Sequence, residues 1–241
     1  MGIVNLTDNS FVEESRLGGL TPAEVVDAVE RKFALGADIV DIGACSSAPG
    51  NAEVSPEVEW GRLEAGLEAV FEALPDRIFS IDTFRGGVAL GCLRVAQKHL
   101  IDPREQLMIN DIKAGSGDPV MLPFISSSGL QYIAMDRTDN PLSFFMDFAA
   151  RAEKEGVQRW ILDPGFGFGK SVERNWEILR NLRSLKVFGK KILVGVSRKR
   201  MIWQEAGLKP QSCRPLSVEA EKFAINSGAD IVRTHDLEYF Y

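Results

Sequence analysis

The chain has 241 residues, of which 45% are hydrophobic and 26% are charged, a balance that suits a globular protein with a sizeable apolar core. Its 34 acidic residues outnumber its 28 basic residues, and the net charge of −6 argues against a nucleic-acid-binding surface. The three cysteines lack metal-type spacing and fit a reduced, cytoplasmic compartment. No apolar run reaches the ~20 residues of a membrane helix, and Met1 leads directly into a strand-like segment, so we expect neither a membrane span nor a signal peptide.

Short apolar segments alternate with amphipathic ones along the whole chain. The apolar segments predict eight strands, at residues 2–6, 37–42, 78–81, 107–109, 131–134, 159–162, 192–196 and 231–233. The amphipathic segments predict seven helices, the first capped by Thr21 and ended by Gly36, and the others at 56–73, 86–98, 120–127, 142–155, 172–185 and 216–226. Strand–helix alternation predicts a parallel sheet, and eight such units predict closure into a (β/α)8 TIM barrel forming one domain over residues 1–241.

The eighth helix is missing from this pattern. After the last predicted strand only residues 236–241 remain, and Leu237, Tyr239, Phe240 and Tyr241 resemble a first helical turn. We expect the rest of that helix to lie beyond residue 241. The alternative is that another surface covers the first and eighth strands, since exposed apolar strand faces favour aggregation.

The segment I-L-D-P-G-F-G-F-G-K at 161–170 places a carboxylate where a buried strand ends. Pro164 and Gly165 stop the strand pairing after Asp163, and Ser171 is suited to cap the helix that follows. A carboxylate at the carboxyl end of a strand, beside a glycine loop, is typical of ligand sites in α/β proteins. The alternative is an ordinary turn in which Asp163 only braces the loop.

Polar residues gather at or just after the other strand ends as well. They are Asn5, Ser46, Asp82, Asn110, Asp163, Lys199, Arg233 and His235. In a barrel these positions converge on one mouth, although strand ends are often polar for no functional reason.

The residue types indicate the ligand. Ionised Asp82 and Asp163 only accept hydrogen bonds, Asn110 donates and accepts, and Lys199 donates, so together they suit a flat heterocycle with amino and oxo groups. Arg233 and His235 resemble an anion clamp. His235 is equally well explained as a strand-end residue bonded to a backbone carbonyl.

The chain resembles the dihydropteroate synthases along essentially its whole length. The matching motifs are M-G-I-V-N-L-T at 1–7, G-A-D-I-V-D-I-G at 36–43, S-I-D-T at 80–83, I-N-D at 109–111, D-P-G-F-G-F-G-K at 163–170, G-V-S-R-K at 195–199 and R-T-H-D at 233–236. The sixth- and seventh-strand motifs are the most specific, and the order of the others strengthens the resemblance.

The resemblance implies a reaction and a role for each matching residue. The family condenses 4-aminobenzoate with 6-hydroxymethyl-7,8-dihydropterin pyrophosphate, releasing pyrophosphate and forming 7,8-dihydropteroate for folate biosynthesis. The carbon–oxygen bond breaks early, and the arylamine attacks the cationic pterin methylene. By position, Asp82, Asn110, Asp163, Lys199 and Arg233 bind the pterin; Ser47, Arg233 and His235 bind the pyrophosphate; Phe168, Ser197 and Lys199 contact the aminobenzoate; and Asn5 helps to hold Mg²⁺. The residues expected to act in catalysis are Arg233, His235 and Lys199, which with Mg²⁺ stabilise the leaving group.

The two loops after the first and second strands depart from the family pattern. The family's T-P-D-S-F reads Thr7-Asp8-Asn9-Ser10-Phe11 here, and its G-G-E-S-T-R-P-G reads G-A-C-S-S-A-P-G at 43–50. Ser47 keeps a hydroxyl, whereas Cys45 and Ala48 replace family residues. The loss of a guanidinium at Ala48 removes a phosphate contact worth about ten- to a hundredfold in binding.

These losses spare the expected pterin pocket, so pterin binding is better supported than turnover. Two other functions remain open. A pterin-binding methyltransferase of the corrinoid type would share the barrel and the pterin carboxylates, but the strand ends at 197–199 and 233–235 disfavour it, since methyl transfer needs no pyrophosphate clamp. A non-catalytic paralogue that binds pterin or a partner enzyme is supported only by the altered loops. The resemblance also implies a homodimer. Sulfonamides mimic 4-aminobenzoate in this family, and because the altered loops border the aminobenzoate pocket, the sequence does not predict whether the protein is sensitive to them. We expect small-molecule substrates and no nucleic-acid or membrane partner.

Overall fold

A computed structural model describes residues 1–7, 21–45, 53–204 and 206–240 of the chain. The described residues form eight strands. They are β1 (Gly2–Asn5), β2 (Ile39–Gly43), β3 (Ile78–Asp82), β4 (Leu107–Asp111), β5 (Gln131–Met135), β6 (Trp160–Asp163), β7 (Leu193–Val194) and β8 (Ile231–Val232). Every strand was predicted, with its ends displaced by no more than two residues.

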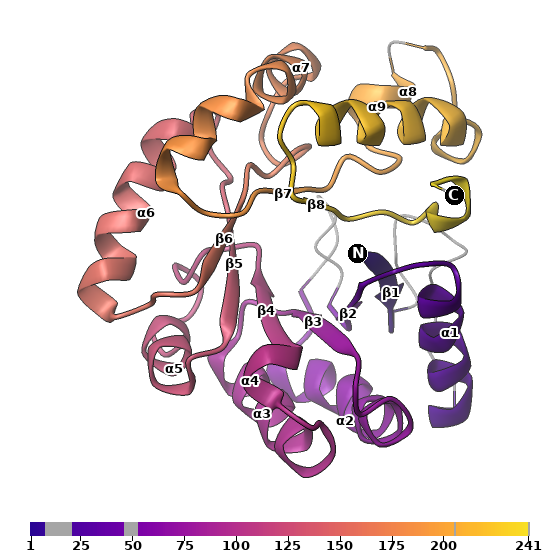
Figure 1. The fold of residues 1–241 in the computed structure, drawn as a ribbon, viewed down its shortest axis with the longest axis vertical. Coiled ribbons are helices and arrows are strands. Elements are labelled where there is room, and N and C mark those ends of the chain that lie inside the picture. Colours follow the sequence, from indigo (N-terminus) through magenta and orange to yellow (C-terminus); the bar gives the residue numbers. More distant parts are fainter. Residues whose placement is uncertain (8–20, 46–52, 205, 241) are drawn as a thin grey trace.

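The strands are arranged as a ring in chain order. β1 to β6 form one parallel sheet, and β7 pairs with β8 in parallel. Isolated bridges between Leu162 and Ile192 and between Gly2 and Thr234 join the two sheets. The predicted (β/α)8 barrel is therefore confirmed, and its two seams are held by single bridges rather than by continuous ladders (Figure 1).

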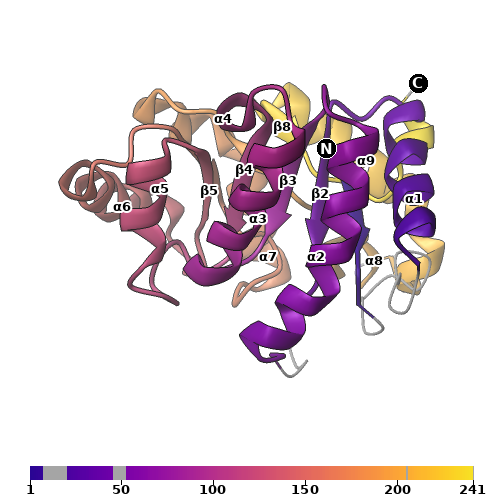
Figure 2. The same cartoon turned by 90° about the horizontal axis from the view of Figure 1, so that it is seen from below.

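Helices surround the strands on the outside of the ring (Figures 1 and 2). The α-helices are α1 (Pro22–Ala34), α2 (Pro56–Ala73), α3 (Gly86–His99), α4 (Pro103–Gln106), α5 (Met121–Ser128), α6 (Pro141–Glu155), α7 (Val172–Arg180), α8 (Arg200–Trp203) and α9 (Arg214–Asn226). The 3-10 turns are η2 (Leu182–Phe188), η3 (Pro210–Ser212) and η4 (Leu237–Tyr239). The short helices α4 and α8 were not predicted.

Helix starts follow the capping residues that the sequence indicates. Thr21 accepts a hydrogen bond from the backbone N–H of Glu24, whose carboxylate in turn accepts from the backbone N–H of Thr21. This reciprocal pair satisfies two of the helix's unpaired donors. Ser171 caps α7 without such a reciprocal partner, accepting from the backbone N–H of Arg174 at 3.1 Å.

Helix α7 ends five residues earlier than predicted. Asn181 follows its last residue and donates through its side chain to the carbonyl of Glu177 at 3.0 Å, and the hydroxyl of Ser184 donates to the carbonyl of Asn181. Such local side-chain hydrogen bonds compete with the helical ladder. The apolar periodicity continues in η2, which buries Leu182 and Leu185, and this explains why the sequence pattern ran past the true end.

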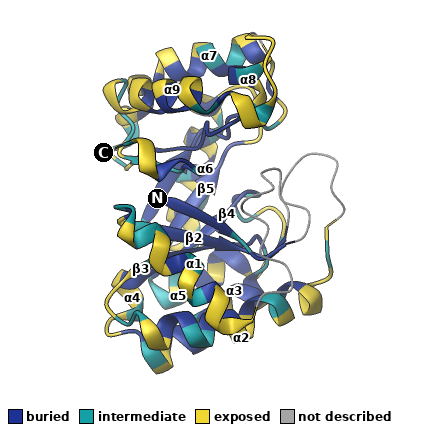
Figure 3. Cartoon of the chain, turned by 90° about the vertical axis from the view of Figure 1, so that its right-hand side faces the viewer, coloured by how far each residue is buried: buried dark blue, intermediate teal, exposed yellow. Residues whose placement is uncertain are grey.

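The apolar core lies between the strands and the inner faces of the helices, while the outer helix faces are exposed (Figure 3). Near the last described residues, Leu237 is 4% exposed and lies against Gly2, where an added Cβ would be 2.9 Å from its Cδ1. Residues 237–239 thus form one turn, as their sequence indicated, and help to cover β1. Both residues of β8 remain half-buried.

Candidate active site

One apolar layer closes the inside of the barrel at the amino ends of the strands. It takes one side chain from each strand or from the residue beside it: Met1, Ile39, Ile78, Met108, Ile133, Ile161, Leu193 and Ile231. Successive side chains of a strand alternate between its faces, so a step of two residues returns to the barrel interior. That step reaches Asp41, Asn110, Asp163 and Arg233, which places these polar groups directly above the apolar layer.

An ionic cluster lies at the centre of this polar layer. Asp41 is fully buried and accepts hydrogen bonds from Arg233 Nε at 2.6 Å and from Asn110 Nδ2 at 3.3 Å. Arg233 Nη2 also lies 3.3 Å from Asp82 Oδ2. The Arg233 guanidinium, just after β8, therefore joins carboxylates from β2 and β3.

Burial in this cluster changes the acidity of Asp82. Desolvation, followed by repulsion from Asp41, raises the pKa of the Asp82 carboxyl to about 7, against the opposing attraction of Arg233. Asn110 beside it is 3% exposed, and its Oδ1 has no hydrogen-bond partner among the described residues. A buried acceptor without a donor costs about 1–3 kcal/mol. The polar side chains at this mouth of the barrel, namely those of Asp41, Asp82, Asn110, Asp163, Lys199, Arg233 and His235, are called the cup below. The part of the cup beside Asn110 is therefore suited to a ligand that supplies N–H groups.

Asp163 at the end of β6 and Lys199 in the turn after β7 are close enough for their charges to interact. Burial raises the pKa of Asp163, with Lys199 opposing the shift, and burial lowers the pKa of Lys199 to about 8, with Asp163 opposing it. Lys199 Nζ donates to the carbonyl of Phe166 and lies 4.9 Å from the ring centroid of Phe168. Gly167 leaves room for this lysine, since an added Cβ would be 3.0 Å from Lys199 Cδ.

The glycine loop after β6 is anchored by a buried lysine. Lys170 Nζ donates to the carbonyls of Asp136 and Gly165, both at 3.1 Å, and lies 3.4 Å from Asp136 Oδ2. Asp163 Oδ1 also accepts from the backbone N–H of Gly165 at 2.8 Å. Asp163 therefore does brace the loop, but with one oxygen of a carboxylate that also interacts with Lys199.

Ser197 and His235 meet beyond the ends of β7 and β8. Ser197 Oγ lies 3.2 Å from His235 Nδ1 and accepts from the backbone N–H of His235 at 3.2 Å. Burial, followed by the charge of Arg233, lowers the pKa of His235 well below its ordinary value, so the ring is neutral near pH 7. The partner of the ring in the described structure is a hydroxyl, in place of the backbone carbonyl considered from the sequence.

The turns that carry Ser197 and His235 are tied together. Arg198 adopts a φ of +52°, which is rare for a residue with a side chain, and its guanidinium binds both carboxylate oxygens of Asp236. Arg214 of α9 lies 3.2 Å from the same carboxylate. These ion pairs hold the two turns in register, because the pair Arg198–Asp236 joins the residues directly following Ser197 and His235.

Phe168 and Asn5 lie at the rim. Phe168 packs on a small apolar cluster formed by Cys45, Phe84, Ile112 and Met135. Asn5 ends β1 opposite Gly43, where an added Cβ would be 3.6 Å from Asn5 Oδ1 and 3.2 Å from Asp82 Cβ. Asn5 thus points toward the mouth near Asp82. In the part of the chain that the structure describes, no three His, Cys, Asp or Glu residues are grouped so as to hold a metal ion.

The structure brings the described candidate residues to one end of the barrel. Ser47, together with Asp8, Asn9 and Ala48 of the altered loops, lies outside the described residues. Sequence reasoning missed Asp41 and Lys170 as parts of the site. Asp41 could have been found because a carboxylate two residues after Ile39 in a buried strand must face the barrel interior.

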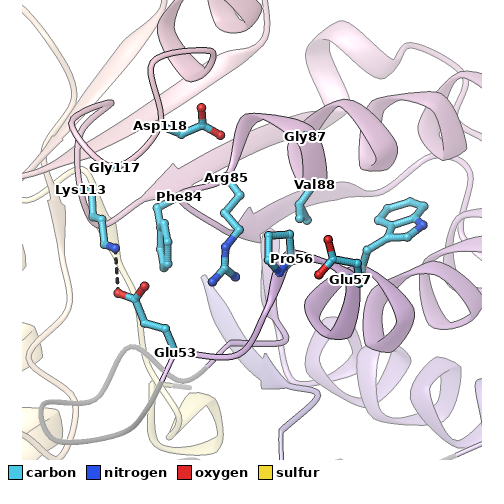
Figure 4. Close-up of a pocket in the computed structure, with 11 residues that line it drawn as sticks. Glu53, Pro56, Glu57, Phe84, Arg85, Gly87, Val88, Lys113, Gly117 and Asp118 are labelled. Carbon is cyan, nitrogen blue, oxygen red and sulfur yellow. Dashed lines mark hydrogen bonds and ion pairs between the residues drawn. The ribbon is translucent and has the colours of Figure 1, made fainter.

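A cavity of about 580 Å³ lies beside the cup (Figure 4). It is bordered by the start of α2, by Phe84 and Arg85 after β3, and by Lys113, which is paired with Glu53 at 2.7 Å. None of the candidate site residues that the structure describes lines it, and of the described rim cluster around Phe168 only Phe84 is shared with it. The cavity is therefore distinct from the polar cup.

Comparison with known proteins gives one consistent family. The family described as "Pterin binding enzyme" matches residues 1–235. Dihydropteroate synthase type-1 of Escherichia coli is 34% identical over 257 residues, covering 97% of this chain and 87% of that protein. The mitochondrial folate synthesis bifunctional protein of Arabidopsis thaliana is 32% identical over 99% of this chain, which spans 47% of that longer protein. The structure of Xanthomonas albilineans dihydropteroate synthase with 4-aminobenzoic acid superimposes with a TM-score of 0.83 at 31% identity, covering 98% of this chain and 87% of that one.

Proposed function

Because this chain belongs to the pterin-binding enzyme family, we propose that its cup performs the dihydropteroate synthase reaction. This transferase reaction condenses 4-aminobenzoate with 6-hydroxymethyl-7,8-dihydropterin pyrophosphate to form 7,8-dihydropteroate and pyrophosphate, a step of folate biosynthesis. The observation that carries the proposal is the buried Oδ1 of Asn110 beside the Asp82 carboxyl, which has no hydrogen-bond partner within the described part of the chain. This acceptor-rich floor suits the N–H groups of a pterin.

Pterin recognition is assigned to Asp82, Asn110, Asp163, Lys199 and Arg233. Each carboxylate accepts from adjacent N–H groups of the ring, and Asn110 Oδ1 gains the donor that it lacks. A bound N–H group favours the ionised carboxylate, so the pterin returns the raised pKa of Asp82 toward its ordinary range. Arg233 keeps its ion pair with Asp41, which fixes the plane of the guanidinium beside the ring.

The aminobenzoate is assigned to the side of the cup formed by Phe168, Ser197 and Lys199. The 4.9 Å contact between the Lys199 ammonium and the Phe168 ring leaves an aromatic surface and a cation side by side. A benzene ring carrying a carboxylate complements both. With a pKa of about 8, Lys199 is mostly protonated at pH 7 and available for this contact.

The pyrophosphate is assigned to Ser47, Arg233 and His235. The carbon–oxygen bond breaks with its electron pair going to the pyrophosphate, the arylamine nitrogen forms the new bond to the pterin methylene, and that nitrogen gives up one proton. Charge therefore accumulates on the leaving group, where Arg233 and a ring N–H of His235 donate to it. Arg233, His235 and Lys199 are the proposed catalytic residues.

Mg²⁺ is the proposed cofactor, and Asn5 is its proposed protein ligand. An amide oxygen directed toward the mouth near Asp82 is a suitable hard donor, and Mg²⁺ commonly takes most of its other ligands from water and substrate phosphates. When bound, the ion neutralises charge on the phosphates.

Pyrophosphate release measured with and without 4-aminobenzoate tests the proposal. Release that depends on 4-aminobenzoate and yields dihydropteroate supports it. Binding of the pterin pyrophosphate without turnover indicates the non-catalytic paralogue, which the sequence change to Ala48 favours. No calorimetric heat with the pterin pyrophosphate and Mg²⁺ would refute the pterin assignment, and complementation of a folate auxotroph provides the test in cells.

No helix among the described residues is both long and apolar enough to cross a membrane. The cytoplasmic location, the homodimer and the single pterin-binding domain over residues 1–241 stay predictions. Gel filtration with light scattering tests the homodimer.

A further inference from the structure

Helix α9 places a carboxyl group inside the protein, directly behind the site. Glu221 is fully buried, and its Oε2 lies 3.1 Å from Thr234 Oγ1. Its Oε1 has no hydrogen-bond partner among the described residues. A carboxyl group this poorly solvated is costly to ionise, and none of the proposed substrate contacts uses it.

Two further hydrogen bonds connect Thr234, and through it this carboxyl group, to the site histidine. Thr234 Oγ1 lies 3.4 Å from Ser197 Oγ, which lies 3.2 Å from His235 Nδ1. Two backbone donors complete the chain: Asp236 N–H donates to Thr234 Oγ1 at 3.0 Å, and His235 N–H donates to Ser197 Oγ at 3.2 Å.

We infer that Glu221 is a positioning residue that selects which ring nitrogen of His235 carries the proton, acting through Thr234 and Ser197. The inference rests on the proposed role of His235 only for its functional consequence. The hydrogen bonds between Glu221 and His235 can run in two directions, toward the histidine or toward the glutamate. The geometry supports the inference because each hydroxyl has one hydrogen and two lone pairs, and all of them are used in either direction.

With Glu221 protonated, every hydroxyl points toward the histidine. Glu221 donates to Thr234, Thr234 donates to Ser197, and Ser197 donates to His235 Nδ1. The neutral ring then carries its proton on Nε2, where it can donate to an anion in the cup. The two backbone N–H groups fill the remaining lone pairs of the hydroxyls.

With Glu221 ionised, the chain reverses. Thr234 donates to the carboxylate, Ser197 donates to Thr234, and Ser197 accepts from His235 Nδ1–H, which leaves Nε2 without a proton. One proton passes from Glu221 to solvent. The ring exchanges one proton between its nitrogens through solvent with no net change in charge, and the cup loses a donor.

The surroundings of Glu221 place its ionisation, and with it the reversal of the hydrogen bonds, in an accessible pH range. Desolvation raises the pKa of Glu221 to about 8, against the hydrogen bonds from Thr234 and Ser197. The other titratable or charged groups around it are the Met1 ammonium, Arg198, Cys213 and Asp236. The charges that affect His235 most are those of Arg233, Arg198, Lys32 and Lys199, and all four oppose its protonation, while the adjacent Asp236 carboxylate is paired with Arg198.

The test reads the tautomer directly by long-range ¹H–¹⁵N correlation of the ligand-free protein between pH 6.5 and 9.5. The chain has two histidines, so a His99→Gln variant assigns the signals. We expect the Nε2–H form of His235 at pH 6.5 and the Nδ1–H form at pH 9.5. Glu221→Gln has no proton to lose in this range and can donate to Thr234 through its amide N–H as the neutral acid does, so it should keep Nε2–H throughout.

Two variants complete the design. Ser197→Ala removes the hydroxyl that contacts His235 Nδ1 and should make the tautomer independent of pH, whereas Glu219→Gln, an exposed position on the same helix, should behave as the unaltered protein. A single tautomer across the range in the unaltered protein, or the same pH-dependent change in Glu221→Gln, would overturn the inference.

Binding of the pterin pyrophosphate separates this inference from the proposed function. The ratio of its Kd in the unaltered protein to that in Glu221→Gln should be about 1 at pH 6.5 and about 10 to 100 at pH 9.5, the effect of one charge-assisted hydrogen bond. The titration of Lys199 and of the ligand changes Kd in both proteins alike, so its effect cancels in this ratio. A tautomer change in a protein that does not bind the ligand would support the relay and refute the proposed function.

Discussion

Replacing Asp41 by asparagine tests the ionic cluster on which the cup is built. Asp41 is fully buried and carries the closest contact to Arg233, at 2.6 Å, whereas Asp82 lies at 3.3 Å. Breaking a buried ion pair costs about 3–5 kcal/mol. Because the Arg233 side chain is 21% exposed and keeps Asp82 as a partner, we expect a smaller loss, about 2–4 kcal/mol of unfolding free energy.

The same substitution should change the acidity of Asp82. Repulsion by Asp41 is, after desolvation, the largest cause of the raised pKa of Asp82, and Asp41→Asn removes it while releasing Arg233 to pair with Asp82 alone. The pKa of Asp82 should therefore fall from about 7. Urea unfolding followed by circular dichroism measures the stability, and ¹³C NMR of the carboxyl groups measures the pKa.

Asp38→Asn is the matched control. Asp38 is exposed directly before β2, so the same chemical change should alter the unfolding free energy by less than about 0.5 kcal/mol. If Asp41→Asn were as stable as this control and the pKa of Asp82 stayed near 7, the cluster would not have the energetic role assigned to it.

Three further predictions concern a loop glycine, the bound pterin and the buried acid of α9. Gly165→Ala should lose about 2–5 kcal/mol of unfolding free energy, because its φ is +65° and an added Cβ would be 1.7 Å from the carbonyl oxygen of Asp136, whereas Gly189→Ala, with φ +64° and open space, should lose only about 1 kcal/mol in the same urea titration. Binding of a pterin at pH 7 should release about half a proton from Asp82, seen by calorimetry in buffers of different ionisation enthalpy, and equal heats in all buffers would contradict it. Glu221 holds a proton in the folded state up to a pKa of about 8 that the unfolded chain loses near 4.5, so unfolding free energy should fall as pH rises between these values, and Glu221→Gln should lack that part of the slope.

Much of the architecture follows from local pattern alone. Alternating apolar strands and amphipathic helices predicted the barrel, and the caps at Thr21 and Ser171 are formed as expected. The polar residues at strand ends could be assigned to one mouth because parallel strands direct their carboxyl ends the same way. The end of α7 could not be predicted, because buried leucines continue into the 3-10 turn that follows it.

The partners of the polar groups were decided by the closed ring. The alternation of side chains along a strand predicts that Asp41 faces inward. Its pairing with Arg233, however, spans 192 positions and exists only because β8 returns beside β1. Likewise, Lys170 finds Asp136, and Glu221 reaches Ser197 through Thr234, only when neighbouring strands and helices are packed. Local sequence determines the face of an element on which a side chain lies, whereas the burial and the neighbouring charges that set its pKa arise from distant segments brought together in the fold.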